Sequence, residues 1–257
     1  MGAVLEVEVW QYAAALDPAT NRAALDRITA RTRADLVVLP EAFNRDFGEA
    51  GSPLAPYAEP LDGPFVGAVR AAAGRSGAAV VGGMFETSQD PERPYNTLAM
   101  VSGHELTTYR KIHLYDSFGY RESDVVSAGP TTPTVVDVAG ARVGLMTCYD
   151  LRFPELGRLL SAAGAEVLVV PAAWVAGEGK VDQWRTLLRA RAIENVAWVV
   201  AAAQPGPRYC GHSMVVAPTG DVVLEAGEGD ERITSTLDLD AVAQARATNP
   251  SLSNRRL

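Results

Sequence analysis

The apolar and polar positions along the chain alternate between two periods, one typical of strands and one typical of helices. Residues 4–10 alternate apolar side chains with Glu6 and Glu8, which predicts a strand with one polar face. Residues 17–33 place apolar side chains at helical spacing after Asp17-Pro18, a pair that favours the start of a helix. Because this switching continues along the chain, the pattern predicts a mixed α/β fold.

The same reasoning locates the remaining elements. Further strands are predicted at 35–39, 78–85, 96–102, 105–110, 134–138, 142–147, 167–170, 197–203 and 233–237, with one more on each side of the turn 218–220. Further helices are predicted at 63–76, 154–163 and 184–196. Long loops, which often carry function, are predicted at 40–61, 111–130 and 172–179. Since no Ser/Gly-rich linker divides the chain, we expect one domain over 1–257, with a site built from loops.

Composition and charge exclude several classes of protein. The 257 residues are 47% hydrophobic and 21% charged, which is typical of a globular protein with a sizeable core. The 31 acidic residues outnumber the 23 basic ones, so a nucleic-acid partner is not expected. We expect no membrane span, because no apolar run of about 18 residues is present. We expect no leader, because the chain does not begin with a charged and then apolar segment before a cleavage site of small residues. Having only two cysteines argues against a secreted disulfide scaffold, and we expect a cytoplasmic protein.

Three residues with complementary chemistry each follow the end of a predicted strand. Glu41 follows the strand DLVVL and Pro40, Lys111 follows the strand that ends at Arg110, and Cys148 follows the apolar run VGLMT. Strand ends in α/β proteins gather at one rim, where ligands bind. A nucleophile, a carboxylate base and a cation would meet there. We also expect the start of the helix after Cys148 to favour its thiolate form.

A Cys–His pair is the main alternative for the nucleophile. His104 falls in a predicted hairpin turn, and His212 at the start of a strand has the character of a hydrogen-bonded structural residue. His113, two residues beyond Lys111, could reach the same rim. The spacing of His, Cys and carboxylate residues predicts no metal site, and no glycine-rich phosphate loop is present, so neither a metal nor a cofactor is expected.

The order of these motifs resembles the nitrilase, or carbon–nitrogen hydrolase, superfamily. The matching blocks are 39–41 (LPE), 109–114 (YRKIHL), 148–155 (CYDLRFPE), 189–195 (RARAIEN) and 211–214 (GHSM). Together they span nearly the whole chain, in the order of the family. Within the superfamily the chain is most similar to the branch of omega-amidase and deaminated glutathione amidase, which also has an Arg-rich ending such as 254–257 (NRRL).

This resemblance implies a fold and a reaction. The fold would be a four-layer α-β-β-α sandwich, one carbon–nitrogen hydrolase domain over 1–257, paired as a homodimer through its helical faces. The triad would be Glu41, Lys111 and Cys148, and Glu122 matches the setting of a second glutamate. The implied reaction hydrolyses a small linear amide to an acid and ammonia through a thioester. Lys111 and the N–H of Tyr149 would stabilise the oxyanion.

The resemblance also indicates residues that would contact the substrate. Related enzymes hold a substrate carboxylate with an arginine near Arg152, although this side chain could instead be scaffold against Glu155 or Glu122. Trp174 falls in a segment that borders the pocket in the family. Lys180 could meet a carboxylate, or be an exposed lysine at a helix start. Glu122 could fix Lys111 or the attacking water, or form a purely structural ion pair with Arg152 or another base.

The chain departs from the family pattern at several positions. Gln183 stands where a histidine is expected, and Cys210 where an aromatic residue is expected. Glu6 and Glu8 stand in a strand that is usually apolar, which suggests that this strand lies at an edge. Because nitrilases use the same triad, the alternatives are a nitrilase and an N-carbamoyl amide hydrolase. A non-catalytic interaction protein on this scaffold is the alternative of another class.

Overall fold

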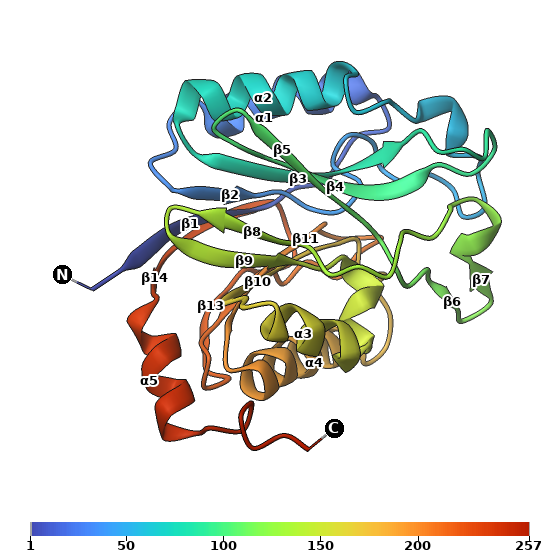
Figure 1. Cartoon of the computed structure of the whole chain (residues 1–257). Helices are drawn as coiled ribbons and strands as arrows, with labels where there is room; N and C mark the ends of the chain where they lie inside the picture. Colours follow the sequence, from blue (N-terminus) through green and yellow to red (C-terminus); the bar gives the residue numbers. More distant parts are fainter. Residues whose placement is uncertain (1, 257) are drawn as a thin grey trace.

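Two six-stranded sheets stacked face to face form the centre of the molecule (Figure 1). The structure is a computed structural model that describes residues 2–256, so the first and last residues of the predicted domain lie outside it. In the first sheet the strands are ordered β14 (Glu231–Asp238), β1 (Val4–Gln11), β2 (Leu36–Val38), β3 (Ala79–Glu86), β4 (Tyr95–Ser102) and β5 (Glu105–Arg110). The central strands β1, β2 and β3 are parallel, and the other neighbours are antiparallel.

The second sheet has the same plan. Its strands are ordered β13 (Val222–Glu225), β12 (Met214–Val216), β11 (Trp198–Ala203), β10 (Val167–Ala172), β9 (Ala141–Leu145) and β8 (Val135–Val138). Here β9, β10 and β11 are parallel. Every residue of β10 and β11 is buried, as expected for parallel strands that are covered on both faces.

Helices cover the outer face of each sheet, which completes four layers (Figure 1). Helices α1 (Pro18–Thr29) and α2 (Pro64–Ser76) pack on the first sheet, and α3 (Pro154–Ala162) and α4 (Lys180–Asn195) pack on the second. The inward side chains of β1, Leu5, Val7 and Val9, belong to the same apolar cluster as those of β11. The predicted α-β-β-α sandwich is therefore confirmed.

Several element boundaries differ from the sequence prediction. Helix α1 ends at Thr29 and not at Arg33, and α4 begins at Lys180 and not at Trp184. A further helix, α5 (Asp240–Thr248), was not predicted, because Val242 is its one buried residue and its apolar pattern is weak. Short elements also lie in the predicted loops: β6 (Asp116–Ser117), β7 (Tyr120–Arg121) and the 3-10 turns η1 (Ala55–Tyr57) and η2 (Glu122–Asp124). A further 3-10 turn, η3 (Cys148–Arg152), lies between the predicted strand 142–147 and the predicted helix 154–163.

The expectation that the first strand lies at an edge is wrong. Strand β1 pairs with β14 on one side and with β2 on the other. Its acidic residues are accommodated by partners: Glu8 is buried and accepts hydrogen bonds from Trp10 Nε1 at 2.6 Å and from Thr32 Oγ1 at 3.1 Å. Glu6 accepts a hydrogen bond from Thr236 Oγ1 on the neighbouring strand at 2.7 Å.

No helix within residues 2–256 is long and apolar enough to span a membrane.

Candidate active site

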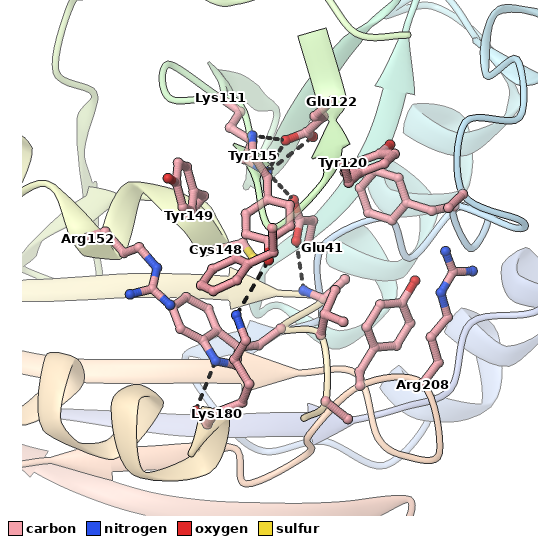
Figure 2. A pocket seen from close by; sticks show the side chains of 18 residues that line it. Glu41, Lys111, Tyr115, Tyr120, Glu122, Cys148, Tyr149, Arg152, Lys180 and Arg208 are labelled. Atoms are coloured by element: carbon pink, nitrogen blue, oxygen red, sulfur yellow. Dashed lines mark hydrogen bonds and ion pairs between the residues drawn. The ribbon is translucent and has the colours of Figure 1, made fainter. Parts of the chain in front are cut away.

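A cavity of about 370 Å³ lies where loops from both sheets meet (Figure 2). All eight residues that the sequence indicated for catalysis or substrate binding line it: Glu41, Lys111, Glu122, Cys148, Tyr149, Arg152, Trp174 and Lys180. Its lining is largely aromatic otherwise, with Phe47, Tyr115, Phe118, Tyr120 and Tyr209. The sandwich thus brings together residues that are far apart in the sequence.

Glu41 is held at the base of the cavity by close contact between its segment and β3. The backbone N–H of Gly83 donates to the carbonyl of Pro40, and the N–H of Asn44 donates to the carbonyl of Gly83. A Cβ atom at position 83 would overlap the nitrogen of Ala42, so only glycine allows the chain after Pro40 to lie this close. This contact fixes Glu41, which is 1% exposed, beside Lys111.

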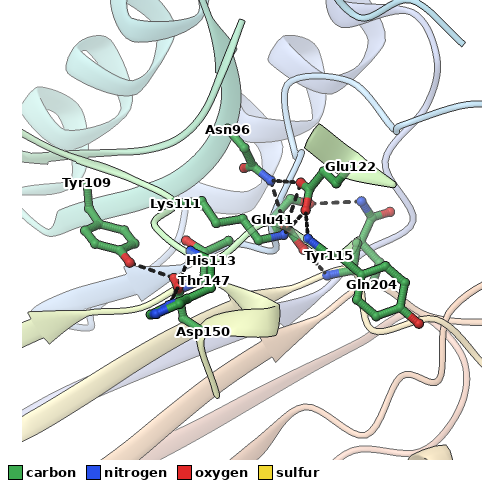
Figure 3. Close-up of polar contacts among 11 residues, drawn as sticks. Glu41, Asn96, Tyr109, Lys111, His113, Tyr115, Glu122, Thr147, Asp150 and Gln204 are labelled. Atoms are coloured by element: carbon green, nitrogen blue, oxygen red, sulfur yellow. Dashed lines mark hydrogen bonds and ion pairs between the residues drawn. The ribbon is translucent and has the colours of Figure 1, made fainter. Parts of the chain in front are cut away.

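The Lys111 ammonium lies between two carboxylates (Figure 3). Its Nζ is 3.0 Å from Glu41 Oε1 and 2.8 Å from Glu122 Oε2, and all three side chains are buried. Burial alone would lower the pKa of Lys111, but the charges of Glu122 and Glu41 outweigh it and raise that pKa well above its usual value. Lys111 is therefore an ammonium at neutral pH, and the base that pairs with Glu122 is Lys111, not Arg152.

Neutral donors complete the coordination of both carboxylates. The backbone N–H of Ala173 donates to Glu41 Oε2 at 2.7 Å, and the N–H of Tyr115 donates to Glu122 Oε2 at 2.7 Å. The amide of Asn96 donates to both, at 2.7 Å to Glu41 Oε1 and at 3.2 Å to Glu122 Oε1. Each carboxylate is thus bound by Lys111, by Asn96 and by one backbone N–H.

Cys148 opens the turn η3 in an uncommon backbone conformation. Its φ of 45° lies in the left-handed region, which is strained for a residue with a side chain. Two hydrogen bonds stabilise the turn: the N–H of Thr147 donates to Asp150 Oδ2 at 2.9 Å, and the N–H of Asp150 donates to the carbonyl of Thr147 at 2.9 Å. Such a turn projects the nucleophile from the end of β9 into the cavity.

The surroundings of Cys148 favour the protonated thiol over the thiolate. Burial raises its pKa well above the usual value, the Glu41 carboxylate raises it further, and Lys111 opposes both. Helix α3 begins only at Pro154, and the five-residue 3-10 turn η3 begins at Cys148 itself. The direction of the pKa shift runs against the expected preference for the thiolate, and a nearby base would assist removal of the thiol proton.

His113 does not pair with Cys148. Its Nδ1 lies 2.7 Å from Asp150 Oδ1, and its ring stacks on Phe153 with centroids 3.8 Å apart. Nor does it belong to the residues that line the cavity. His212 has the structural role expected for it, since its Nδ1 lies 2.7 Å from Glu225 Oε1.

Arg152 and Lys180 form a cationic wall on one side of Cys148, and Arg208 lies on the other side (Figure 2). Arg152 donates to Gln183 Oε1 at 2.7 Å, and its guanidinium lies 4.8 Å from the centre of the Trp174 ring. Lys180 Nζ lies 3.7 Å from the centre of the Phe118 ring, and burial and the nearby Arg152 charge lower its pKa.

The wall carries uncompensated positive charge. Within residues 2–256, neither Arg152 nor Lys180 has a carboxylate within 4.0 Å, so the predicted alternative of Arg152 held against Glu155 or Glu122 does not occur. Arg208, in contrast, is paired with Asp46 Oδ1 at 3.0 Å. An anion entering this side of the cavity would find two cations and no competing carboxylate.

Sequence reasoning missed several residues of the site: Asn96, Tyr115, Tyr120, Arg208 and Tyr209. Three of them come from loops and Tyr120 from the two-residue strand β7, segments too irregular or short for a periodic pattern to indicate the direction of a side chain. Asn96 lies in β4, and nothing in the sequence distinguishes it from an ordinary polar residue at the start of an apolar strand. Among residues 2–256 there is no group of three His, Cys, Asp or Glu side chains placed to hold a metal ion.

Comparison with known proteins shows the family to which the chain is similar. The family model described as "Carbon-nitrogen hydrolase" matches residues 7–247. The deaminated glutathione amidase of Escherichia coli O157:H7 is 39% identical over 236 residues, covering 91% of this chain and 89% of the relative.

Solved structures agree over almost the entire length. A CN-hydrolase superfamily protein from Xanthomonas campestris, with an arsenic adduct in its active site, has a TM-score of 0.89 and 30% identity, covering 99% of this chain and 98% of its own. A second similar structure is a variant of the amidase from Nesterenkonia sp. AN1 that shows Michael addition of acrylamide at the active-site cysteine. Its TM-score is 0.80 and its identity 30%, and the match covers 95% of this chain and 97% of the amidase chain.

Proposed function

The chain belongs to the carbon–nitrogen hydrolase family and acts on amides, and on this basis we propose that it hydrolyses a small anionic amide with Glu41, Lys111 and Cys148 as its catalytic residues. One observation carries the assignment of these residues: a buried ammonium between two carboxylates lies in the same cavity as a cysteine with a strained backbone. Glu122 is the fourth member of this group.

The first half of the reaction forms a thioester. Glu41 takes the proton of the Cys148 thiol as the sulfur attacks the amide carbonyl, so no free thiolate is needed beforehand. The Lys111 ammonium and the N–H of Tyr149 stabilise the negative oxygen of the tetrahedral intermediate. Glu41 then gives its proton to the departing nitrogen, the carbon–nitrogen bond breaks, and ammonia leaves.

The second half releases the acid. Glu41, again a carboxylate, takes a proton from water, and the hydroxide attacks the thioester carbonyl. The carbon–sulfur bond breaks, the proton returns to Cys148, and the acid leaves. Glu122 keeps the Lys111 ammonium aimed at the oxyanion during both steps. The chemistry needs no metal or cofactor.

The cationic wall supports an anionic substrate. Arg152 can bind a carboxylate in a bidentate manner, and Lys180 can add a second contact. Trp174 supports the Arg152 guanidinium through a cation–π contact and borders the same wall. A linear amide with a terminal carboxylate would place its carbonyl at Cys148 and its anion at this wall.

Ammonia release from a panel of compounds tests this proposal. The panel contains alpha-ketoglutaramate, deaminated glutathione, uncharged aliphatic amides, an N-carbamoyl amino acid and a nitrile, with Cys148→Ala as the matched control; loss of deaminated glutathione itself is followed separately, since cleavage of its amide releases an amine. Turnover of an anionic amide that disappears in the variant supports the proposal. A preference for the nitrile or the carbamoyl compound contradicts the substrate class. An unreactive wild-type Cys148 with no turnover would favour a non-catalytic interaction protein.

We also propose that the chain forms a homodimer through its α3–α4 layer. Leu159 on α3 is 49% exposed and Ile193 on α4 is 46% exposed, so this outer face carries apolar side chains that a second copy could cover. Light scattering on the wild type and on Leu159→Asp should give a dimer and a monomer, respectively. A monomeric wild type would contradict the proposal.

The two cysteines support a cytoplasmic location. Cys148 and Cys210 are both buried free thiols, a state maintained by a reducing compartment. Fractionation of cells followed by detection of the protein tests this location, and recovery outside the cytoplasm would contradict it.

A further inference from the structure

Asn96 is buried at the centre of the charged group at the base of the cavity (Figure 3). It lies near the start of β4, between β3 and β5, opposite Phe85 on one neighbour. Its backbone carbonyl accepts the N–H of Lys111 at 2.8 Å, while its side-chain amide donates to Glu41 and Glu122. One residue therefore contacts the backbone of the lysine and both carboxylates that bind the lysine side chain.

The charges of Glu41, Glu122 and Lys111 do not balance one another. Two buried carboxylates face a single ammonium, which leaves one negative charge in excess while Cys148 is a neutral thiol. Like charges in a buried site favour uptake of a proton by one of them. A protonated Glu41 could not act as a base toward Cys148. The site therefore needs donors that favour the ionised form of both carboxylates.

We propose that Asn96 is a positioning residue that keeps Glu41 and Glu122 ionised and separated beside Lys111, so that Glu41 is ready to take the Cys148 proton. This inference rests on the proposed function, because it presumes that Glu41 is the base. The orientation of the amide supports it: its nitrogen faces both carboxylates, while Asn96 Oδ1 has no hydrogen-bond partner within residues 2–256. The side chain thus leaves its acceptor unsatisfied in order to donate twice.

The other titratable groups around the pair keep one charge state near neutral pH. Burial raises the pKa of Tyr120 to about 12, and burial and Asp46 raise that of Tyr209 well above its usual value. The pKa values of Lys111 and Cys148 are also raised, and Arg208 stays charged. Tyr120, Tyr209, Lys111 and Arg208 therefore do not account for a change in the reactivity of Cys148 near neutral pH.

Alkylation of Cys148 by methyl vinyl ketone, which has no amide bond to hydrolyse, gives a readout that does not require knowledge of the natural substrate. The sulfur adds to the terminal carbon of the carbon–carbon double bond, the thiol proton ends on the carbon next to the carbonyl, and the proposal predicts that Glu41 speeds the removal of that proton. Intact mass gives the rate at each pH, and Cys148→Ala gives the background from Cys210. The acid limb is the part of the pH–rate profile where the rate of alkylation falls toward low pH, and under this proposal that fall follows protonation of the carboxylate pair.

Two variants of Asn96 and one control separate positioning from a structural role. Asn96→Ala removes both hydrogen bonds, so the acid limb should move up by about one pH unit. Asn96→Asp has nearly the same size but adds a third carboxylate, and it should move the limb further or abolish labelling near neutral pH. Thr97→Val, on the adjacent buried residue that bonds Glu86 at 2.8 Å instead, should leave the limb in place. Melting temperatures confirm that each variant is folded.

The outcomes distinguish this inference from the proposed function. If Glu41→Gln abolishes the acid limb while both Asn96 variants keep the wild-type limb, Asn96 is structural and the inference is overturned. If Glu41→Gln alkylates like the wild type at every pH, the base is another group and the proposed mechanism fails. On the natural substrate, Asn96→Ala should lower kcat by up to about a hundredfold with little change in KM, as expected for a displaced base.

Discussion

The Tyr109 hydroxyl donates a 2.6 Å hydrogen bond to the buried carboxylate of Asp150. Tyr109 lies two residues before Lys111, and Asp150 lies two residues after Cys148, so this bond joins the segments that carry the cation and the nucleophile (Figure 3). Asp150 also accepts the backbone N–H groups of His113 and Thr147, at 3.0 and 2.9 Å. The two sheets are thereby tied together next to the reacting atoms.

Removing the Tyr109 hydroxyl should weaken this link. Tyr109→Phe leaves a buried carboxylate oxygen with one donor fewer, which should cost about 1–3 kcal/mol of the free energy of unfolding. It should also lower the rate at which Cys148 reacts. Urea unfolding and the alkylation rate measure the two effects. Tyr57→Phe is the matched control, since that side chain is 41% exposed, and an equal loss in the control would contradict the prediction.

Lys111 should contribute strongly to stability as well as to catalysis. Lys111→Met leaves two buried carboxylates without their cation, which should cost about 3–5 kcal/mol. Because the pKa of Lys111 is raised above its unfolded value, its contribution is fully present below the unfolded value, and is lost only as the pH rises through the folded one. Unfolding at neutral pH is therefore a suitable test.

Lys180→Met is the control for this experiment. It removes the same kind of side chain from the rim of the cavity, where no carboxylate of the described residues lies within 4.0 Å, so stability should change by less than about 1 kcal/mol. Equal stabilities of the two variants would show that the buried ion pairs of Lys111 do not stabilise the fold.

The Cys148 thiol should remain protonated at neutral pH. Burial and the Glu41 carboxylate raise its pKa, so the titration of this thiol moves in the alkaline direction relative to a free cysteine. The ultraviolet absorbance of thiolate, measured as the difference between the wild type and Cys148→Ala, should therefore be absent at neutral pH and appear only at a higher pH than in a free cysteine. A full thiolate band at neutral pH would show that Lys111 dominates the electrostatics of the sulfur.

The cationic wall should select the charge of the substrate. Arg152→Gln should raise KM for an anionic amide by about ten- to a hundredfold, since it removes a hydrogen-bonded charge pair. Lys180→Met should have a smaller effect, because this side chain can make only a single contact. Neither should affect an uncharged amide. Initial rates on a pair of amides of equal length, one with and one without the carboxylate, make this comparison, and equal effects on both would contradict an anion site.

The alternation of strand and helix periods predicts the α/β class, whereas the four layers were expected only from the resemblance to the carbon–nitrogen hydrolase superfamily; the three candidate catalytic residues were expected to lie close together, and the structure places them in one cavity. Glu41, Lys111 and Cys148 each follow an apolar strand, and such strands bring their ends to one rim whatever the details of the loops. The helix α5 was missed because Val242 alone among its residues is buried, so burial leaves almost no periodic pattern. The edge position inferred for the first strand was wrong because a single buried carboxylate such as Glu8 can be satisfied inside a sheet by local donors.

The neighbours of the catalytic group could not have been predicted in the same way. The role of Asn96 depends on the pairing of β4 with β3 and β5, which brings Glu41 and Lys111 to its amide. Likewise, the charge state of Cys148 depends on how deeply its thiol is buried and on its distance from Glu41. A sequence motif contains no information on either quantity. Arg208 belongs to a loop whose direction is set by its contact with Asp46.

The central claim is that Cys148 carries the acyl group of the substrate. Mixing the enzyme with an amide that it turns over, quenching with acid and measuring the intact mass tests this directly. The account predicts a transient increase by the mass of the acyl group, located on the peptide that contains Cys148 and absent in Cys148→Ala. Turnover without such an adduct, with activity retained in Cys148→Ala, would contradict it.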